Sequence, residues 1–175
     1  MKELKNLRNQ PDWRANAFLT AQIILDNTTW LPSIINEICT LSDQEYRDKA
    51  SEWLDGYLNS FYRSMKAVRR NNELGALLQA SSSIVYFINC IFSLNRLIPP
   101  YLDRIEILLN RLEHVPMEKE VLSELLVSVS KSANPDNQIQ LFNATEKLLR
   151  SFGFDSVYEA WDDKLENEVN YWRKR

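Results

Sequence analysis

Glycine and histidine are scarce in this sequence, and their scarcity excludes several kinds of site. Only three glycines occur, Gly56, Gly75 and Gly153, and they lie far apart. P-loops, dinucleotide-binding turns and other phosphate-cradling loops need clustered glycines, so all of them are excluded. The single histidine, His114, excludes metal motifs with two histidines and leaves little scope for a nucleophile activated by histidine.

Long runs of one charge, bilayer-length apolar segments and paired cysteine motifs are lacking too. The net charge is −3 with acids and bases interspersed, so charge alone does not favour strong binding to nucleic acid or anionic lipid. The longest apolar-rich stretch, 84–94, contains Asn89 and is too short to span a bilayer. Cys39 and Cys90 lie inside apolar helical patterns, which predicts buried free thiols in a reducing compartment. With no apolar segment following Met1, we expect a cytoplasmic protein without membrane attachment.

Helical patterning of apolar residues is what the sequence has in abundance. Ser42, followed three residues later by Glu45, matches a capping box and predicts the start of a long helix that ends near Asn71. One stripe of this helix is predicted to be buried: Ala50, Trp53, Leu54, Tyr57, Leu58, Phe61, Met65 and Val68. A second long helix, from Glu73 to about Leu97, is apolar on most of its circumference and is predicted to be the most buried one. Because the turn between the two helices is short, they must pack antiparallel.

Shorter helices are predicted for the rest of the chain. They are expected at about 28–41, 102–112, 117–130, 136–152 and 156–172. Gly153 is expected to be the C-cap between the last two. The predicted fold is therefore all-α, an up-and-down bundle of about five to seven helices that forms one domain at 29–175.

The N-terminal segment, residues 1–28, has a different pattern. Its residues 18–25 form a short apolar run that becomes β-branched toward its end and is bounded by turn formers, which predicts a strand. No second strand is predicted, and a lone strand leaves its backbone groups unpaired. Three interpretations remain open: the segment is helical, it pairs across a dimer, or its sheet lies in another polypeptide.

Acidic pairs with the spacing of a two-metal site occur twice. Asp43 and Glu45 are two positions apart, as are Glu118 and Glu120, but both pairs open predicted helices. On a helix such side chains point about 200° apart, and acids at a helix start favour its dipole instead. A third acidic group is expected to be a solvated helix face: Asp162, Asp163 and Glu166. We therefore expect no metal site, no catalytic residue and no cofactor.

Polar residues interrupt the second long helix and give the best candidates for a binding site. They are Ser81, Ser82, Ser83 and Asn89 within the helix, and Asn95 and Arg96 at its end. Buried polar groups need partners, so one interpretation is hydrogen bonding between helices. The other is a polar pocket wall beside Tyr86 and Tyr101, in which Arg96 binds a carboxylate or another anion through two hydrogen bonds.

Three stretches of the chain resemble one family. They are Ile24-Leu25-Asp26 with Leu31-Pro32, then Phe92-Ser93-Leu94-Asn95-Arg96 with Pro99-Pro100-Tyr101, and Ser156-Val157-Tyr158-Glu159-Ala160-Trp161. Together they resemble the helical C-terminal domain, related to HEPN domains, of aminoglycoside (kanamycin) nucleotidyltransferase-like proteins. The resemblance covers residues 28–172. That family's catalytic sheet domain is marked by a Gly-Ser turn and an Asp-x-Asp or Asp-x-Glu strand, and this sequence has no Gly-Ser pair.

The resemblance implies a helical substrate-binding or dimerisation domain without a catalytic site of its own. It implies that Asn95, Arg96 and Tyr101 contact a small-molecule acceptor, and Tyr86 and Asn89 join them as residues of the same pocket wall. The implied partner is a second copy of the chain or a separate nucleotidyltransferase catalytic chain. Residues 1–28 would then connect to the sheet domain or be a remnant of it.

A free-standing HEPN-like interaction protein is the alternative, for example a toxin–antitoxin component that acts through protein contacts. A ribonuclease of this kind needs an arginine followed by a histidine after four to six residues. Two residues separate Arg111 from His114, and nine separate Arg104 from His114. The ribonuclease motif is therefore absent.

Overall fold

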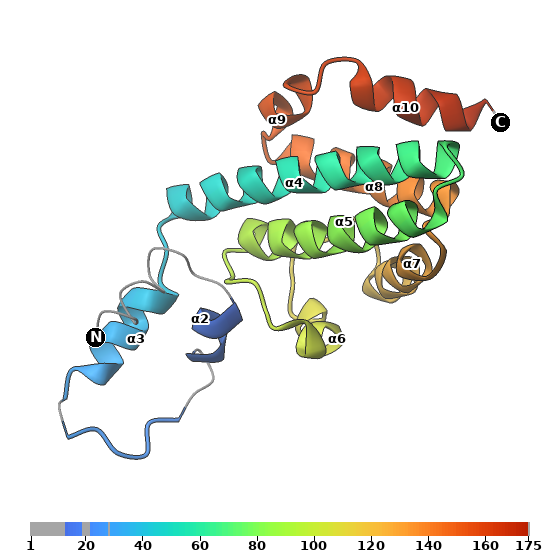
Figure 1. Cartoon of the computed structure of the whole chain (residues 1–175). Coiled ribbons are helices and arrows are strands. Elements are labelled where there is room, and N and C mark those ends of the chain that lie inside the picture. The colour runs from blue at the N-terminus through green and yellow to red at the C-terminus, as the bar shows by residue number, and fades with distance from the viewer. Residues whose placement is uncertain (1–12, 19–21, 28, 175) are drawn as a thin grey trace.

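Two long antiparallel helices, α4 (Asp43–Arg69) and α5 (Glu73–Leu94), form the centre of this computed structural model (Figure 1). The structure describes residues 13–18, 22–27 and 29–174. The prediction of an all-α fold with an antiparallel pair of long helices is confirmed. Across the described residues there are nine α-helices and no strand. This exceeds the expected five to seven, because a further short helix lies near the N-terminus and the last predicted helix is divided in two.

Side-chain caps fix where the two long helices begin. The Ser42 hydroxyl accepts a hydrogen bond from the Glu45 amide at 3.2 Å, and the Glu45 carboxylate accepts one from the Ser42 amide at 2.7 Å. This reciprocal pair is the predicted capping box. The chain reverses at Asn71, whose φ is +56°. Asn72 then accepts a hydrogen bond from the Gly75 amide at 3.0 Å and starts α5.

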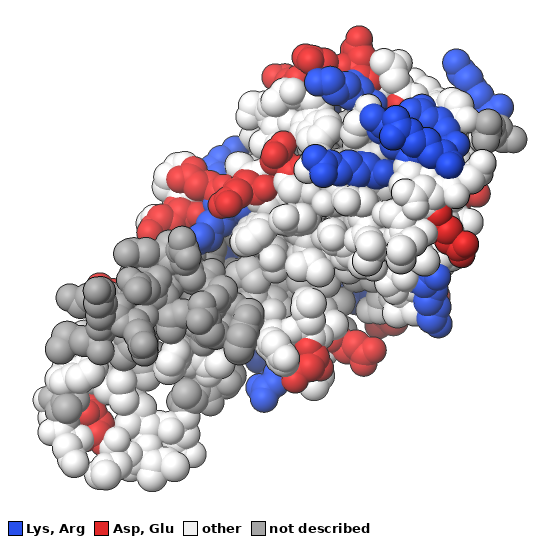
Figure 2. All heavy atoms as spheres, viewed as in Figure 1, with Lys and Arg blue, Asp and Glu red and all other residues white. Residues whose placement is uncertain are grey.

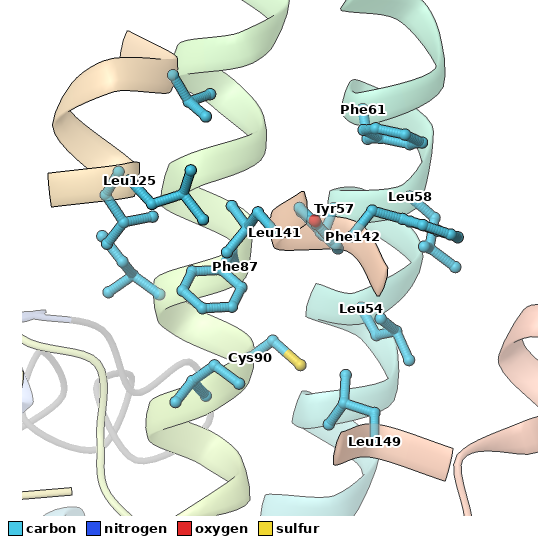
Figure 3. Packing of buried hydrophobic residues seen from close by; sticks show 14 of the residues in the cluster. Leu54, Tyr57, Leu58, Phe61, Phe87, Cys90, Leu125, Leu141, Phe142 and Leu149 are labelled. Atoms are coloured by element: carbon cyan, nitrogen blue, oxygen red, sulfur yellow. The ribbon is translucent and has the colours of Figure 1, made fainter. Parts of the chain in front are cut away.

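The core lies between the α4–α5 pair and the helices that cover it. Helix α7 (Lys119–Ser132) packs on α5, and α8 (Pro135–Ser151) contacts both α4 and α7. Figure 3 shows large apolar side chains from these four helices meeting in the interior. Among them, the rings of Phe61 and Phe142 stack with their centroids 4.8 Å apart and their planes 10° apart. The molecule therefore has one main core, built around α4 and α5.

Three ionisable side chains lie inside this core. Burial raises the pKa of the Tyr57 phenol, the Cys90 thiol and the Tyr158 phenol, so all three stay uncharged. The Cys90 thiol donates to the Ala50 carbonyl at a sulfur–oxygen distance of 3.4 Å. Cys39 is partly buried, and both cysteines are free. The prediction of free cysteines is confirmed, whereas the predicted burial is correct for Cys90 and wrong for Cys39.

Gly153 ends α8 as the sequence predicts. Its φ is +77°, a conformation that L side chains rarely adopt. The Gly153 amide donates to the Arg150 carbonyl, and the next amide, that of Phe154, donates to the Leu149 carbonyl. This pair of bonds is a Schellman motif, which satisfies the last carbonyls of the helix.

The single helix predicted at 156–172 is wrong. The structure has two helices there, α9 (Asp155–Glu159) and α10 (Lys164–Arg173). Asp162 lies between them with a φ of +49°, and the neighbouring Trp161 indole donates to the Asp55 carboxylate of α4 at 2.9 Å. A tertiary contact thus holds the turn against α4, which periodicity along the sequence does not reveal.

The predicted helix at 102–112 is shorter than expected. It consists of a 3₁₀ turn at Leu102–Arg104 followed by α6 (Ile105–Leu109). Residues 110–118 form a turn and an irregular segment that leads to α7. The chain therefore crosses from α5 to α7 with only a short helix between them.

Two short helices lie at the N-terminal end. They are α2 (Trp13–Phe18) and α3 (Leu31–Cys39), which pack on each other. Ala15, Ile38 and Ile98 are buried together in a second, small cluster. The predicted helical character of the segment after residue 28 is confirmed, while this cluster is separate from the main core.

The strand predicted at 18–25 is wrong in its described part, and residues 19–21 and 28 lie outside the described residues. Residues 22–27 have no regular structure. The Asp26 carboxylate accepts hydrogen bonds from the Thr29 and Leu31 amides at 3.1 and 3.3 Å. The segment therefore forms a turn that leads into α3. The domain boundary at residue 28 stays a prediction.

Candidate functional site

Asn95 clamps the end of α5 to the segment that precedes α7. Its amide nitrogen donates to the Ile91 and His114 carbonyls, both at 2.8 Å. Its amide oxygen accepts from the Glu113 and His114 backbone amides at 2.9 and 2.8 Å. Both ends of this side chain are engaged by the fold itself, so its position is explained by structure without a ligand.

Replacing Asn95 by alanine is expected to lower the free energy of unfolding by about 1–2 kcal/mol, because the contacts to the 113–114 segment are lost. The amides of Glu113 and His114 should also exchange with deuterium faster than in the wild type. Urea unfolding and amide exchange measure the two effects. Asn110→Ala, at an exposed position, is the matched control and should change the free energy by less than about 0.5 kcal/mol. Unchanged exchange at both amides would contradict the clamp.

Arg96, the residue after Asn95, also has a structural role. Its φ of +56° places it where a helix C-cap normally has glycine, and its amide donates to the Ser93 carbonyl. The Arg96 guanidinium is exposed and pairs with the exposed carboxylate of Asp43 at 3.1 Å. An exposed pair of this kind adds little stability. The Arg96 guanidinium, which was predicted to bind an anion, is therefore paired with a carboxylate of the same chain.

The remaining predicted site residues lie on α5 and in the loop that follows it. Tyr86 packs against α4, where its ring lies over Gly56 and its centroid is 5.9 Å from that of Trp53. Asn89 is half-buried on α5, and Tyr101 is exposed in the loop after it. That the five residues line one pocket therefore stays a prediction.

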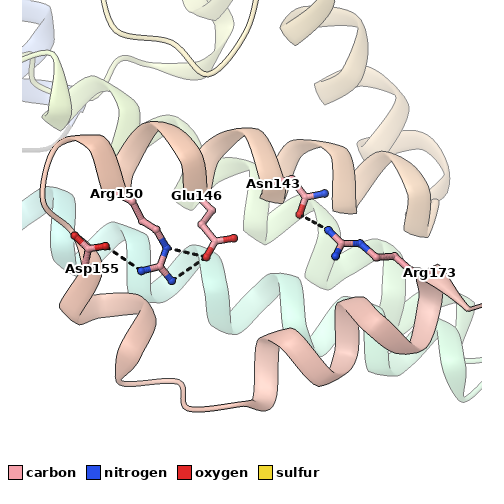
Figure 4. Close-up of polar contacts among 5 residues, drawn as sticks. All are labelled: Asn143, Glu146, Arg150, Asp155 and Arg173. Atoms are coloured by element: carbon pink, nitrogen blue, oxygen red, sulfur yellow. Dashed lines mark hydrogen bonds and ion pairs between the residues drawn. The ribbon is translucent and has the colours of Figure 1, made fainter.

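A polar hollow of about 220 Å³ lies between α8 and the α9–α10 segment. Figure 4 shows its main contacts. Arg150 donates to Glu146 at 2.9 Å and to Asp155 at 3.0 Å, and Arg173 donates to Asn143 at 3.1 Å. Partial desolvation lowers the pKa of Arg150, but the hydrogen bonds to the two carboxylates outweigh it and raise the pKa. Both arginines are thus engaged in holding the C-terminal helices to α8.

The predicted carboxylate pairs occur at helix starts, as expected. Asp43 and Glu45 lie in the first turn of α4, and Glu120 lies in the first turn of α7. Within the described ranges, no three His, Cys, Asp or Glu side chains gather closely enough to hold a metal ion.

An uncharged row of side chains, exposed except at the half-buried Asn89, runs along α5 and was not predicted. Its members are Leu74, Leu78, Ser81, Ser82, Val85 and Asn89, which we call the α5 stripe. Leu74 is 69% exposed, Leu78 60% and Val85 38%. The predicted burial of this helix is therefore wrong along the stripe, including at Ser81 and Ser82. The stripe fits within about 100° of the helix circumference and is about 22 Å long, at 1.5 Å per residue.

Apolar surface continues beside the α5 stripe. A groove of about 190 Å³ lies between α5, α6 and α7, and its lining is mainly apolar: Ile84, Ile88, Ile105, Leu109, Leu126 and Val127, with Glu106, Ser123 and Ser130. In Figure 2 the surface over α5 is mostly uncharged, and charged side chains gather toward its margins. This apolar face, made of the α5 stripe and the groove beside it, is the candidate functional site of the molecule.

The comparisons with known proteins found no match to this sequence or structure. No protein-family model matches the sequence, and searches of curated proteins and of solved structures find no match. The nucleotidyltransferase and HEPN resemblances accordingly stay predictions.

Proposed function

We propose that this chain acts by docking another protein onto the α5 stripe and the groove beside it. The single observation that carries the proposal is the exposure of Leu74, Leu78 and Val85 in one row. An exposed helix face normally has charged residues, and contiguous apolar surface usually marks an interaction site. After Glu73, α5 contains no charged residue on any side.

The exposed face of α4 shows how a solvated helix face differs from the α5 stripe within the same molecule. Its exposed positions include Arg47, Asp48, Glu52, Asp55 and Arg63, all charged. A helix that is solvated throughout the life of the protein gains solubility from such residues. The lack of charge on the α5 stripe therefore favours a surface that is covered when the protein functions.

A membrane is the other surface that covers apolar side chains. Among the helices of the described part, α5 alone is long and apolar enough to cross a bilayer, by length and composition, but a core helix passes the same test. One face of α5 is committed to the core, with Phe87 and Ile91 buried. Ser81 and Ser82 occupy the middle of the exposed stripe, and Glu106 lines the groove. Lipid-binding helices have wide apolar faces flanked by basic residues, so this pattern favours a protein partner.

The resemblance to nucleotidyltransferase-like proteins supports the same general role. In that setting the chain is a helical dimerisation or docking domain, and its partner is a second copy or a separate catalytic chain. The HEPN-like alternative, a free-standing interaction protein, also acts through protein contacts. Because Asn95 and Arg96 are both engaged within the fold, the geometry favours docking over binding of a small-molecule acceptor.

Chemical crosslinking in intact cells tests this function. The tagged wild-type chain should form an adduct larger than its own 20.6 kDa. Leu78→Glu should reduce the adduct yield at least tenfold, because burying an unpaired carboxylate at an interface costs more than about 1.4 kcal/mol.

The matched control is Leu25→Glu, which changes a 76% exposed leucine away from α5. It should leave the adduct unchanged. Circular dichroism of the purified variants verifies that both keep the helical fold. Equal adduct yields from Leu78→Glu and the wild type would show that the α5 stripe is not the docking surface.

A further inference from the structure

The α5 stripe is symmetric along its own length. Its positions, 74, 78, 81, 82, 85 and 89, are arranged symmetrically about a point between Ser81 and Ser82, and all of them except the half-buried Asn89 are exposed. Reversing the helix direction about this point exchanges Leu78 with Val85 and Leu74 with Asn89. An isologous dimer requires a surface that is complementary to itself after such a reversal.

We propose that the partner docked on the α5 stripe is a second copy of this chain, with the two α5 helices packed antiparallel about Ser81 and Ser82. The inference rests on the proposed docking function and adds the identity of the partner. In this arrangement Leu78 contacts Val85 of the second copy, and this contact occurs twice because of the two-fold axis.

Side-chain size favours this packing. Ser81 and Ser82 are small and lie at the centre, where two helices approach most closely. Leu74 and Leu78 are large and lie to one side, 69% and 60% exposed. In the antiparallel pair each large leucine meets the smaller Val85 or Asn89 of the second copy, so the two rows can interlock at the 8–10 Å separation of packed helices.

Charge favours a second copy as well. Two identical surfaces that meet at a two-fold axis bring each charged residue near its own copy, and like charges at an interface cost free energy. The stripe has no charged residue, so this repulsion is absent along it, and Glu106 is the one charged side chain among those that line the adjoining groove. A different protein could instead be recognised through complementary charges, and the stripe offers none for such recognition.

The groove beside the stripe enlarges the contact. A stable dimer buries about 800 Å² per partner, which is more than one row of six side chains supplies. Val127 of α7 is 48% exposed and lines the groove together with Ile84 of α5. Because this apolar surface adjoins the stripe, it lies where the second copy would cover it. We therefore expect a dimer of micromolar affinity, as small interfaces commonly give.

Sedimentation equilibrium of the purified full chain, between about 1 and 100 µM, tests the proposal. The wild type should reach twice 20.6 kDa. Leu78→Glu and Val85→Lys should each raise the dissociation constant at least about 100-fold, since each substitution is present twice in the interface. The double variant Leu78→Glu/Val85→Lys places opposite charges in contact in both halves of the dimer. It should return to within about tenfold of the wild type.

The double variant is the decisive measurement, because only the antiparallel register brings positions 78 and 85 together. If it dimerises no better than the single variants, this register is wrong. A monomeric wild type at 100 µM would overturn the second copy as partner. The docking function would then still stand if the cellular adduct remained sensitive to Leu78→Glu. Flotation of the wild type with vesicles of zwitterionic and anionic lipid, abolished by Leu78→Glu, would overturn both proposals in favour of a membrane surface.

Discussion

Replacing Phe61 by alanine is expected to lower the free energy of unfolding by about 3–5 kcal/mol. Phe61 is 1% exposed and its ring stacks on Phe142, which joins α4 to α8. The substitution removes the apolar surface that the ring buries and leaves a cavity between two helices that are distant in sequence. Urea denaturation followed by circular dichroism measures the change.

Leu25→Ala is the control for the Phe61 prediction, because Leu25 is 76% exposed and lies outside the α5 stripe. In the monomer it should change the free energy by less than about 0.5 kcal/mol. Phe61→Leu should fall between the two variants, since leucine refills part of the space. A loss below about 1 kcal/mol for Phe61→Ala would show that α8 does not pack on α4 through this pair.

Replacing Arg69 by methionine is expected to lower the free energy of unfolding by about 2–3 kcal/mol. Arg69 pairs at 3.2 Å with the carboxylate of Glu168, which is only 3% exposed. Removing one partner of a buried pair commonly costs about 3–5 kcal/mol, and we place the effect lower because Arg69 is a third exposed and screened by solvent. The Trp172 indole also still donates to Glu168 at 3.2 Å. Chemical denaturation measures the loss.

The double variant Arg69→Met/Glu168→Gln separates charge from packing. Because glutamine has no charge to neutralise, the double variant should recover at least half of the stability that Arg69→Met loses. Arg63→Met, on the exposed side of α4, is the control and should change the free energy by less than about 0.5 kcal/mol. A double variant as unstable as Arg69→Met would show that the lost packing of the Arg69 side chain over Tyr171 is the main effect.

The sequence predicted a helix end correctly where that end depends on residues only a few positions apart, through a side-chain cap or through the backbone preference of glycine. Ser42 with Glu45 gives the start of α4, and Gly153 gives the end of α8. The same reasoning failed at 156–172, where Trp161 of the turn is held by Asp55, more than a hundred positions earlier. It also failed at 18–25, where Asp26 forms a turn and the apolar run has no neighbouring strand in the described part of the chain.

The predicted binding residues show that a polar position in an apolar helix does not by itself identify a binding site. Asn95 and Arg96 interrupt an apolar pattern, and the sequence permits either a ligand contact or a contact within the fold. The structure brings the backbone of His114 and the carboxylate of Asp43 to these two side chains. Partners that come from distant segments decide this question, and sequence spacing does not reveal them.

The sequence by itself determined that the chain is helical, that α4 and α5 form an antiparallel pair, and that α5 has no charge after Glu73. Composition and periodicity are local properties, and these features follow from them. Only the tertiary structure decided which side of α5 stays uncovered. Leu78 and Phe87 are both apolar residues of the same helix, yet one is 60% exposed and the other 1%. The difference arises because neighbouring helices cover one face of α5 and leave the stripe open.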